Sequence, residues 1–119
     1  MDDQHRIEPA PDGGVRFFLP TAERELAILS RRMPDLPETL AREVVAFVQR
    51  LRSADLTKVP GIAETIDWAA ALEALGGKRL EVEQVERTLG ALLKYQEDVA
   101  ALKGGGAAKL LDAVRAGTR

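Results

Sequence analysis

The chain has 119 residues, of which 45% are hydrophobic and 30% are charged, so we expect one globular domain with one modest core. The formal net charge of −2 argues against a general nucleic-acid binder. The sequence holds no cysteine and one histidine, His5, which excludes zinc–thiolate sites and cysteine nucleophiles and argues against a histidine-based metal site or triad within this chain.

We expect neither a membrane span nor a secretory signal in this sequence. No apolar run approaches the roughly 18 residues that a membrane span needs. Met1 is followed by Asp2 and Asp3 rather than by a basic region and an apolar stretch, which is unlike a secretory signal. The sequence therefore predicts a cytoplasmic location without membrane association.

The first third of the chain alternates between proline-rich stretches and helical patterns. Residues 1–14 show no apolar periodicity and are expected to be a flexible leader, and residues 15–19 are expected to be extended. Thr21 is a good N-cap for a first helix over 22–32, which Pro34 ends. A second helix is predicted to start at Asp35, with Glu38 completing a capping arrangement, and to continue to Leu51.

Three further helical patterns follow a loop at 53–60. A third helix is predicted over 62–75 and stopped by Gly76-Gly77, and a fourth over 81–103. The triple glycine at 104–106 breaks the pattern, after which residues 107–116 allow a short fifth helix. We therefore predict an all-α fold, a compact bundle of four main helices at 15–103, with a leader at 1–14 and a glycine hinge and tail helix at 104–119.

A phosphate-binding loop of the type G-x-x-x-x-G-K-[S/T] does not occur. Gly76-Gly77-Lys78-Arg79 is faintly similar, but it follows a helix without the strand that such a loop requires, so it is interpreted as a helix stop. We therefore predict no catalytic residues, no metal ligands and no enzyme activity for the chain by itself.

The segment from Lys58 to Ala69 has a purely local interpretation. Gly61 can cap the third helix, and Glu64 and Asp67 place negative charge in its first two turns, where the helix dipole favours it. Trp68, the only tryptophan, is expected to anchor the core. This interpretation requires no ligand.

The same segment carries a resemblance to a known family. Residues 56–68, LTKVPGIAETIDW, and residues 89–98, LGALLKYQED, resemble the C-terminal region of MoxR-type AAA+ ATPases. Residues 22–29 with Met33-Pro34 resemble the helix that opens the small lid domain of that family. The resemblance covers about residues 15–102, and it is closest to the branch implicated in maturing molybdenum–copper carbon monoxide dehydrogenase.

The resemblance implies a helical lid that packs over a nucleotide held by a larger domain. ATP and Mg²⁺ would belong to that larger domain, and partners would be the large domain, neighbouring ring subunits and a von Willebrand factor A-domain protein. The implied role is chaperone-like remodelling or metallocofactor insertion. The chain departs from the family in lacking the Walker motifs, so the resemblance implies no catalysis by the lid alone.

A second departure concerns the nucleotide contact. Many AAA+ lids carry an arginine at the start of the third lid helix, but no arginine occurs between Pro60 and Leu75. Glu64 would repel a phosphate, so Lys58, with Gly61 at the helix start, is the predicted nucleotide contact in the presence of the large domain. Arg16-Phe17 also resembles the pair that ends the family's large domain, but Val15 replaces its acidic predecessor.

Two other functions are alternatives to the lid. A free-standing helical interaction or adaptor module would share the fold but lack the ATPase partner domain. A helix-turn-helix DNA binder is disfavoured, because the third helix carries Glu64, Asp67 and Glu73 and no basic residue.

Overall fold

The computed structural model describes residues 8–9, 15–16 and 19–117. The short strands β1 (Glu8–Pro9) and β2 (Val15–Arg16) pair antiparallel, with Glu8 opposite Arg16. The extended conformation expected at the start of 15–19 is thus present at β2. Phe17, His5 and most of the expected leader at 1–14 lie outside the described residues.

The first helix, α1 (Ala22–Arg32), begins and ends where the sequence predicts. The backbone N–H of Arg24 donates to the Thr21 hydroxyl at 3.2 Å, which confirms Thr21 as the N-cap. The second helix, α2 (Glu38–Leu51), begins later than predicted, and Asp35 is not its cap. Pro37 takes the N-cap position, and a residue before proline is kept out of the helical region, so the helix cannot extend back through Leu36.

Helix α3 (Ile62–Ala74) confirms the predicted third helix to within one residue. Gly61 is its N-cap, and Gly76 adopts a left-handed φ of 76° just after its end. The N–H of Gly77 reaches back to the Leu72 carbonyl at 3.3 Å, the pattern of a glycine-terminated helix.

The predicted single helix over 81–103 is wrong. Helix α4 (Val82–Leu92) ends early because Leu93 and Tyr95 are extended, and the chain then forms α5 (Gln96–Ala101), the π-helical segment η2 (Leu102–Gly106) and α6 (Ala107–Gly117). The expected break at 104–106 is a kink within η2, where Gly105 has a φ of +111°.

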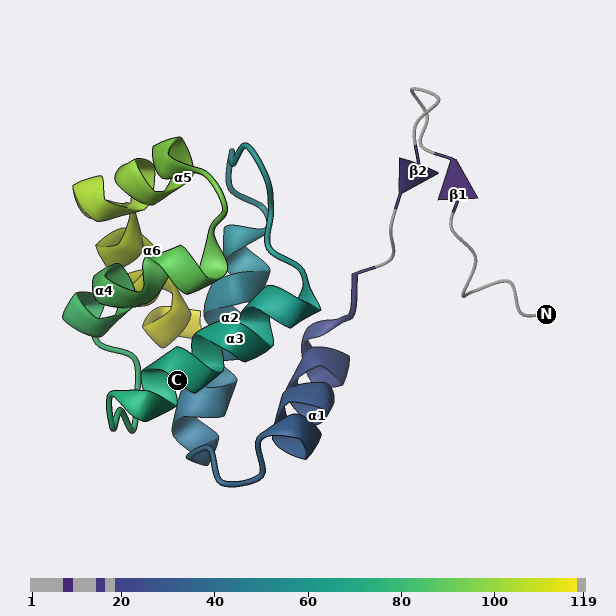
Figure 1. Ribbon diagram of the computed structural model, residues 1–119, viewed down its shortest axis with the longest axis vertical. Coiled ribbons are helices and arrows are strands. Elements are labelled where there is room, and N and C mark those ends of the chain that lie inside the picture. Colours follow the sequence, from purple (N-terminus) through teal and green to yellow (C-terminus); the bar gives the residue numbers. More distant parts are fainter. Residues whose placement is uncertain (1–7, 10–14, 17–18, 118–119) are drawn as a thin grey trace.

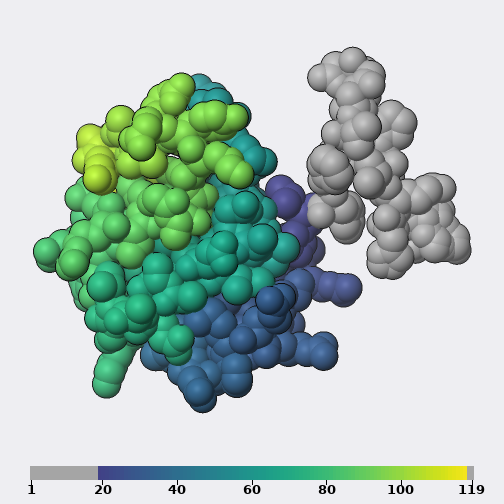
Figure 2. Space-filling view, viewed as in Figure 1, coloured from purple at the N-terminus to yellow at the C-terminus, as the bar shows by residue number. Residues whose placement is uncertain are grey.

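The helices form one bundle, which confirms the predicted all-α fold (Figure 1). Helix α2 packs against α1, α3 and α6, and α3 packs against α4. Trp68 on α3 is fully buried, as predicted, and the centroid of its ring lies 5.2 Å from the ring centroid of Phe47 on α2. In Figure 2, α3 crosses the middle of the visible face, between blue residues of α1 and α2 below and green residues above.

Candidate functional site

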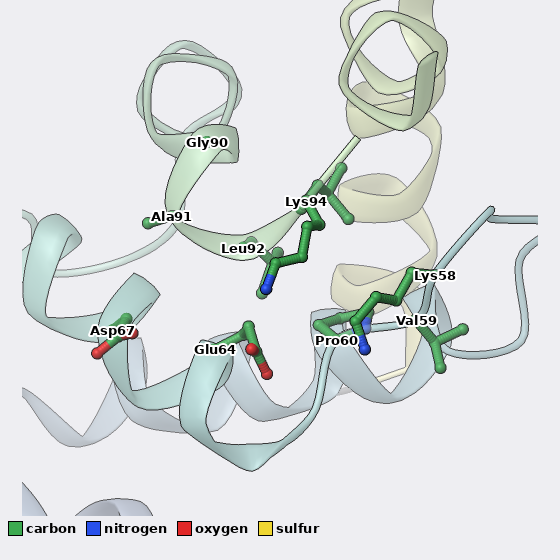
Figure 3. Close-up of a pocket in the computed structure, with 10 residues that line it drawn as sticks. Lys58, Val59, Pro60, Glu64, Asp67, Gly90, Ala91, Leu92 and Lys94 are labelled. Atoms are coloured by element: carbon green, nitrogen blue, oxygen red, sulfur yellow. The ribbon is translucent and has the colours of Figure 1, made fainter. Parts of the chain in front are cut away.

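A cavity of about 340 Å³ opens between the loop that precedes α3, the first turns of α3 and the end of α4 (Figure 3). It is lined by Lys58, Val59, Pro60, Glu64, Asp67, Gly90, Ala91, Leu92, Leu93 and Lys94. We call this cavity the α3–α4 pocket. Its walls come from residues 56–68 and 89–98, the two segments that carry the resemblance.

The loop carrying Lys58 is fixed by a buried carboxylate on α5. Asp98 is 4% exposed, and its two oxygens accept hydrogen bonds from the backbone N–H groups of Thr57 at 2.9 Å and Lys58 at 3.3 Å. These bonds satisfy a carboxylate that would otherwise be costly to bury. The turn at residues 93–95 places α5 where Asp98 reaches the loop.

Gly61 lies at the start of α3, but its backbone N–H already has a partner. It donates to Oε1 of Glu64 at 2.9 Å, so the carboxylate reaches back over the first turn of its own helix. This hydrogen bond, together with the Glu64 backbone N–H and the positive charges of Lys58 and Lys94, holds the pKa of Glu64 below its usual value, while partial burial opposes the shift. An external anion at Gly61 would compete with this carboxylate.

Two lysines approach the α3–α4 pocket from different segments. Lys58 comes from the loop before α3 and Lys94 from the turn after α4, and both ammonium groups lie on the side of the pocket where Glu64 projects (Figure 3). Lys58 and Gly61 are the residues predicted from the sequence, whereas Lys94 was not predicted. Lys94 lies in the stretch 89–98 that carries the resemblance, but its nearness to Lys58 depends on the turn that ends α4.

The pocket offers two exposed ammonium groups opposed by Glu64, with Asp67 one turn further along α3. Such a set can attract an anion but holds no nucleophile paired with a base. Within the described part of the chain, no cluster of three or more His, Cys, Asp or Glu side chains could hold a metal ion.

A second hollow of about 540 Å³ lies between α1 and α2. It is lined by Ala22, Glu23, Leu26, Thr39, Arg42, Glu43, Val45 and Ala46. Four of the residues that line it are apolar: Ala22, Leu26, Val45 and Ala46.

Comparison of the chain with protein-family models, with curated proteins and with solved structures gives no match. Among the described residues, no helix combines the length and the apolar character that crossing a membrane requires.

Proposed function

We propose that this chain is the helical lid of a MoxR-type AAA+ ATPase and that it contributes no catalysis by itself. One observation carries the proposal: the two segments that resemble the family, 56–68 and 89–98, meet in one pocket and are joined by hydrogen bonds from Thr57 and Lys58 to Asp98.

In this proposal Lys58 contacts the phosphates of a nucleotide that a larger domain binds. Lys94 adds a second positive charge from the opposite wall, which offsets the repulsion by Glu64. ATP and Mg²⁺ belong to the large domain, because this chain has neither a phosphate-binding loop nor a Walker B strand. The lid would act in the cytoplasm, with the large domain, neighbouring ring subunits and a von Willebrand factor A-domain protein as partners, in chaperone-like remodelling or metallocofactor insertion.

A free-standing adaptor module is the second candidate. The hollow between α1 and α2 favours it, since a hollow lined by both apolar and polar residues suits a partner's side chains. The genomic sequence upstream of Met1 distinguishes the two functions: a reading frame with a Walker A loop supports the lid, and its absence supports the adaptor.

The decisive experiment measures ATP turnover after the chain is joined to the ATPase domain that the upstream reading frame encodes. We expect Lys58→Ala and Lys94→Ala each to lower turnover severalfold without changing the thermal unfolding of the lid, because each removes one exposed positive charge. Lys109→Ala, an exposed lysine on α6, is the matched control and should leave turnover unchanged.

Unchanged turnover in both pocket variants would overturn the nucleotide contact. The chain alone should bind ATP no more tightly than about millimolar, because it lacks a cradle of backbone N–H groups. Calorimetry that gives a micromolar affinity for the chain alone would contradict the assignment of the nucleotide to the large domain.

A further inference from the structure

A buried ion pair joins α1 to the end of α2. Glu25 on α1 is fully buried, and Arg52, just past α2, has a side chain that is 7% exposed. The guanidinium donates to both carboxylate oxygens, from Nη1 to Oε1 at 2.8 Å and from Nη2 to Oε2 at 2.7 Å. Gln49 and the Thr65 hydroxyl each donate a further hydrogen bond to Glu25 at 2.8 Å.

The third donor of Arg52 reaches the loop beside the α3–α4 pocket. Its Nε donates to the Pro60 carbonyl at 2.8 Å. Pro60 lines the pocket and lies two residues after Lys58, so the guanidinium binds a pocket wall and an α1 carboxylate at the same time. Arginine can do this because its donors form a rigid, planar fork, whereas a lysine presents one point of charge.

The network also reaches the chain just before α1. Nε2 of Gln49 donates to the Pro20 carbonyl at 3.3 Å as well as to Glu25. A continuous series of hydrogen bonds therefore runs from Pro20 through Glu25 and Arg52 to Pro60. The Gly61 carbonyl lies 3.1 Å from the Thr65 hydroxyl and is the alternative acceptor for its single proton.

Such a network fixes geometry more than it adds stability. A buried ion pair often contributes no more than apolar residues of similar size, but removing one partner leaves an uncompensated charge. If α1 moved away from α2, Arg52 would lose its counter-charge and could not remain buried in its present position. The Pro60 carbonyl would then lose its donor.

We propose that Glu25 and Arg52 are positioning residues that couple the placement of α1 to the conformation of the loop at 53–61. This inference goes beyond the proposed function, because it holds equally for a lid and for an adaptor. A force or partner acting on the start of α1 changes the position of Lys58 through this pair. Asp98 accepts hydrogen bonds from Thr57 and Lys58 of the same loop, so these two N–H groups report on whether the loop opens.

Amide hydrogen exchange followed by NMR on the full chain tests the coupling. The reporters are the backbone N–H groups of Thr57, Lys58 and Gly61 in the loop, which donate to the carboxylates of Asp98 on α5 and Glu64 on α3. We expect Glu25→Gln to raise the exchange rates of these N–H groups about tenfold or more above any rise in the exchange rates of α4, because local opening of the loop becomes easier. Glu23→Gln, the same change at an exposed site on α1, should leave them unchanged.

Two outcomes would overturn the coupling. One is unchanged exchange at the three reporters in Glu25→Gln, and the other is an equal acceleration in the loop and in α4, which indicates a general loss of stability. Arg52→Lys provides a second test if Glu25→Gln does not fold, because it keeps the charge pair but cannot form the fork. In Arg52→Lys we expect faster exchange at the three loop reporters, while the N–H groups of α1 exchange as slowly as in the unmodified chain. Unaltered exchange at the loop reporters would refute the role of Arg52.

Discussion

Replacing Trp68 with alanine tests whether the core is built as described. A tryptophan buries on the order of 200 Å², and at about 25 cal/mol per Å² its burial is worth about 5 kcal/mol. Compactness of the unfolded chain lowers this figure, so we expect a loss of about 3–5 kcal/mol, in the usual range for deleting a large buried aromatic residue. That is a large share of the roughly 5–15 kcal/mol that stabilise a domain.

Trp68→Phe separates the contribution of the indole N–H to stability from that of the aromatic ring. The indole N–H donates to the Thr88 hydroxyl at 2.7 Å, and that hydroxyl itself donates to the Gln84 carbonyl at 2.7 Å. Phenylalanine keeps an aromatic ring against Phe47, and the Thr88 hydroxyl still donates to the Gln84 carbonyl. We therefore expect the free energy of unfolding to fall by about 1–2 kcal/mol.

Urea unfolding followed by far-UV circular dichroism measures both variants, since this signal does not depend on the tryptophan. Tyr95→Ala is the control, because Tyr95 is 43% exposed and its loss should change stability by no more than about 0.5 kcal/mol. A loss below about 1 kcal/mol for Trp68→Ala would refute the burial argument, because a fully enclosed side chain cannot be removed at that cost.

Two further predictions concern backbone conformation and pH. Gly76→Ala should destabilise the chain by about 1–2 kcal/mol, because Gly76 has a left-handed backbone conformation. Gly90→Ala should stabilise the chain by about 0.5–1 kcal/mol, because Gly90 is helical and its added methyl group meets no atom. A lower free energy of unfolding for Gly90→Ala in urea would contradict this. The lowered pKa of Glu64 gives stability that is present above the unfolded-state pKa and is lost as pH falls through the folded-state pKa. Acidification from neutral pH to about pH 3 should therefore weaken the unmodified chain more than Glu64→Gln, and equal losses would argue against the shift.

Local chemistry was sufficient to predict α1 and α3. Thr21 offers a hydroxyl to the first turn of α1, and Gly76 permits the left-handed residue that ends α3, so both boundaries depend on neighbours in sequence. The start of α2 also depends on neighbours, but the steric effect of Pro37 on Leu36 outweighed the capping pattern at Asp35.

The candidate site was only partly accessible from sequence. Lys58 and Gly61 were selected from their place before α3, and the structure puts both beside Glu64. Lys94 could not be selected in the same way, because the residues from 81 to 103 have one uninterrupted helical pattern. The turn at 93–95 that brings Lys94 to the pocket contains no glycine or proline from which it could have been predicted.

The sequence by itself determined the all-α class, the absence of a phosphate-binding loop and the helix ends that caps and glycines mark. Only the tertiary structure decided where α4 ends and how the pocket is held. The reason is distance in the sequence: the buried Asp98 accepts from Thr57 and Lys58, which lie 41 and 40 residues away, and the buried Glu25 accepts from Gln49 and Arg52, which lie 24 and 27 residues away. A carboxylate in a helical pattern looks like a solvated residue until folding buries it, and it must then be satisfied by whichever donors the packing brings near.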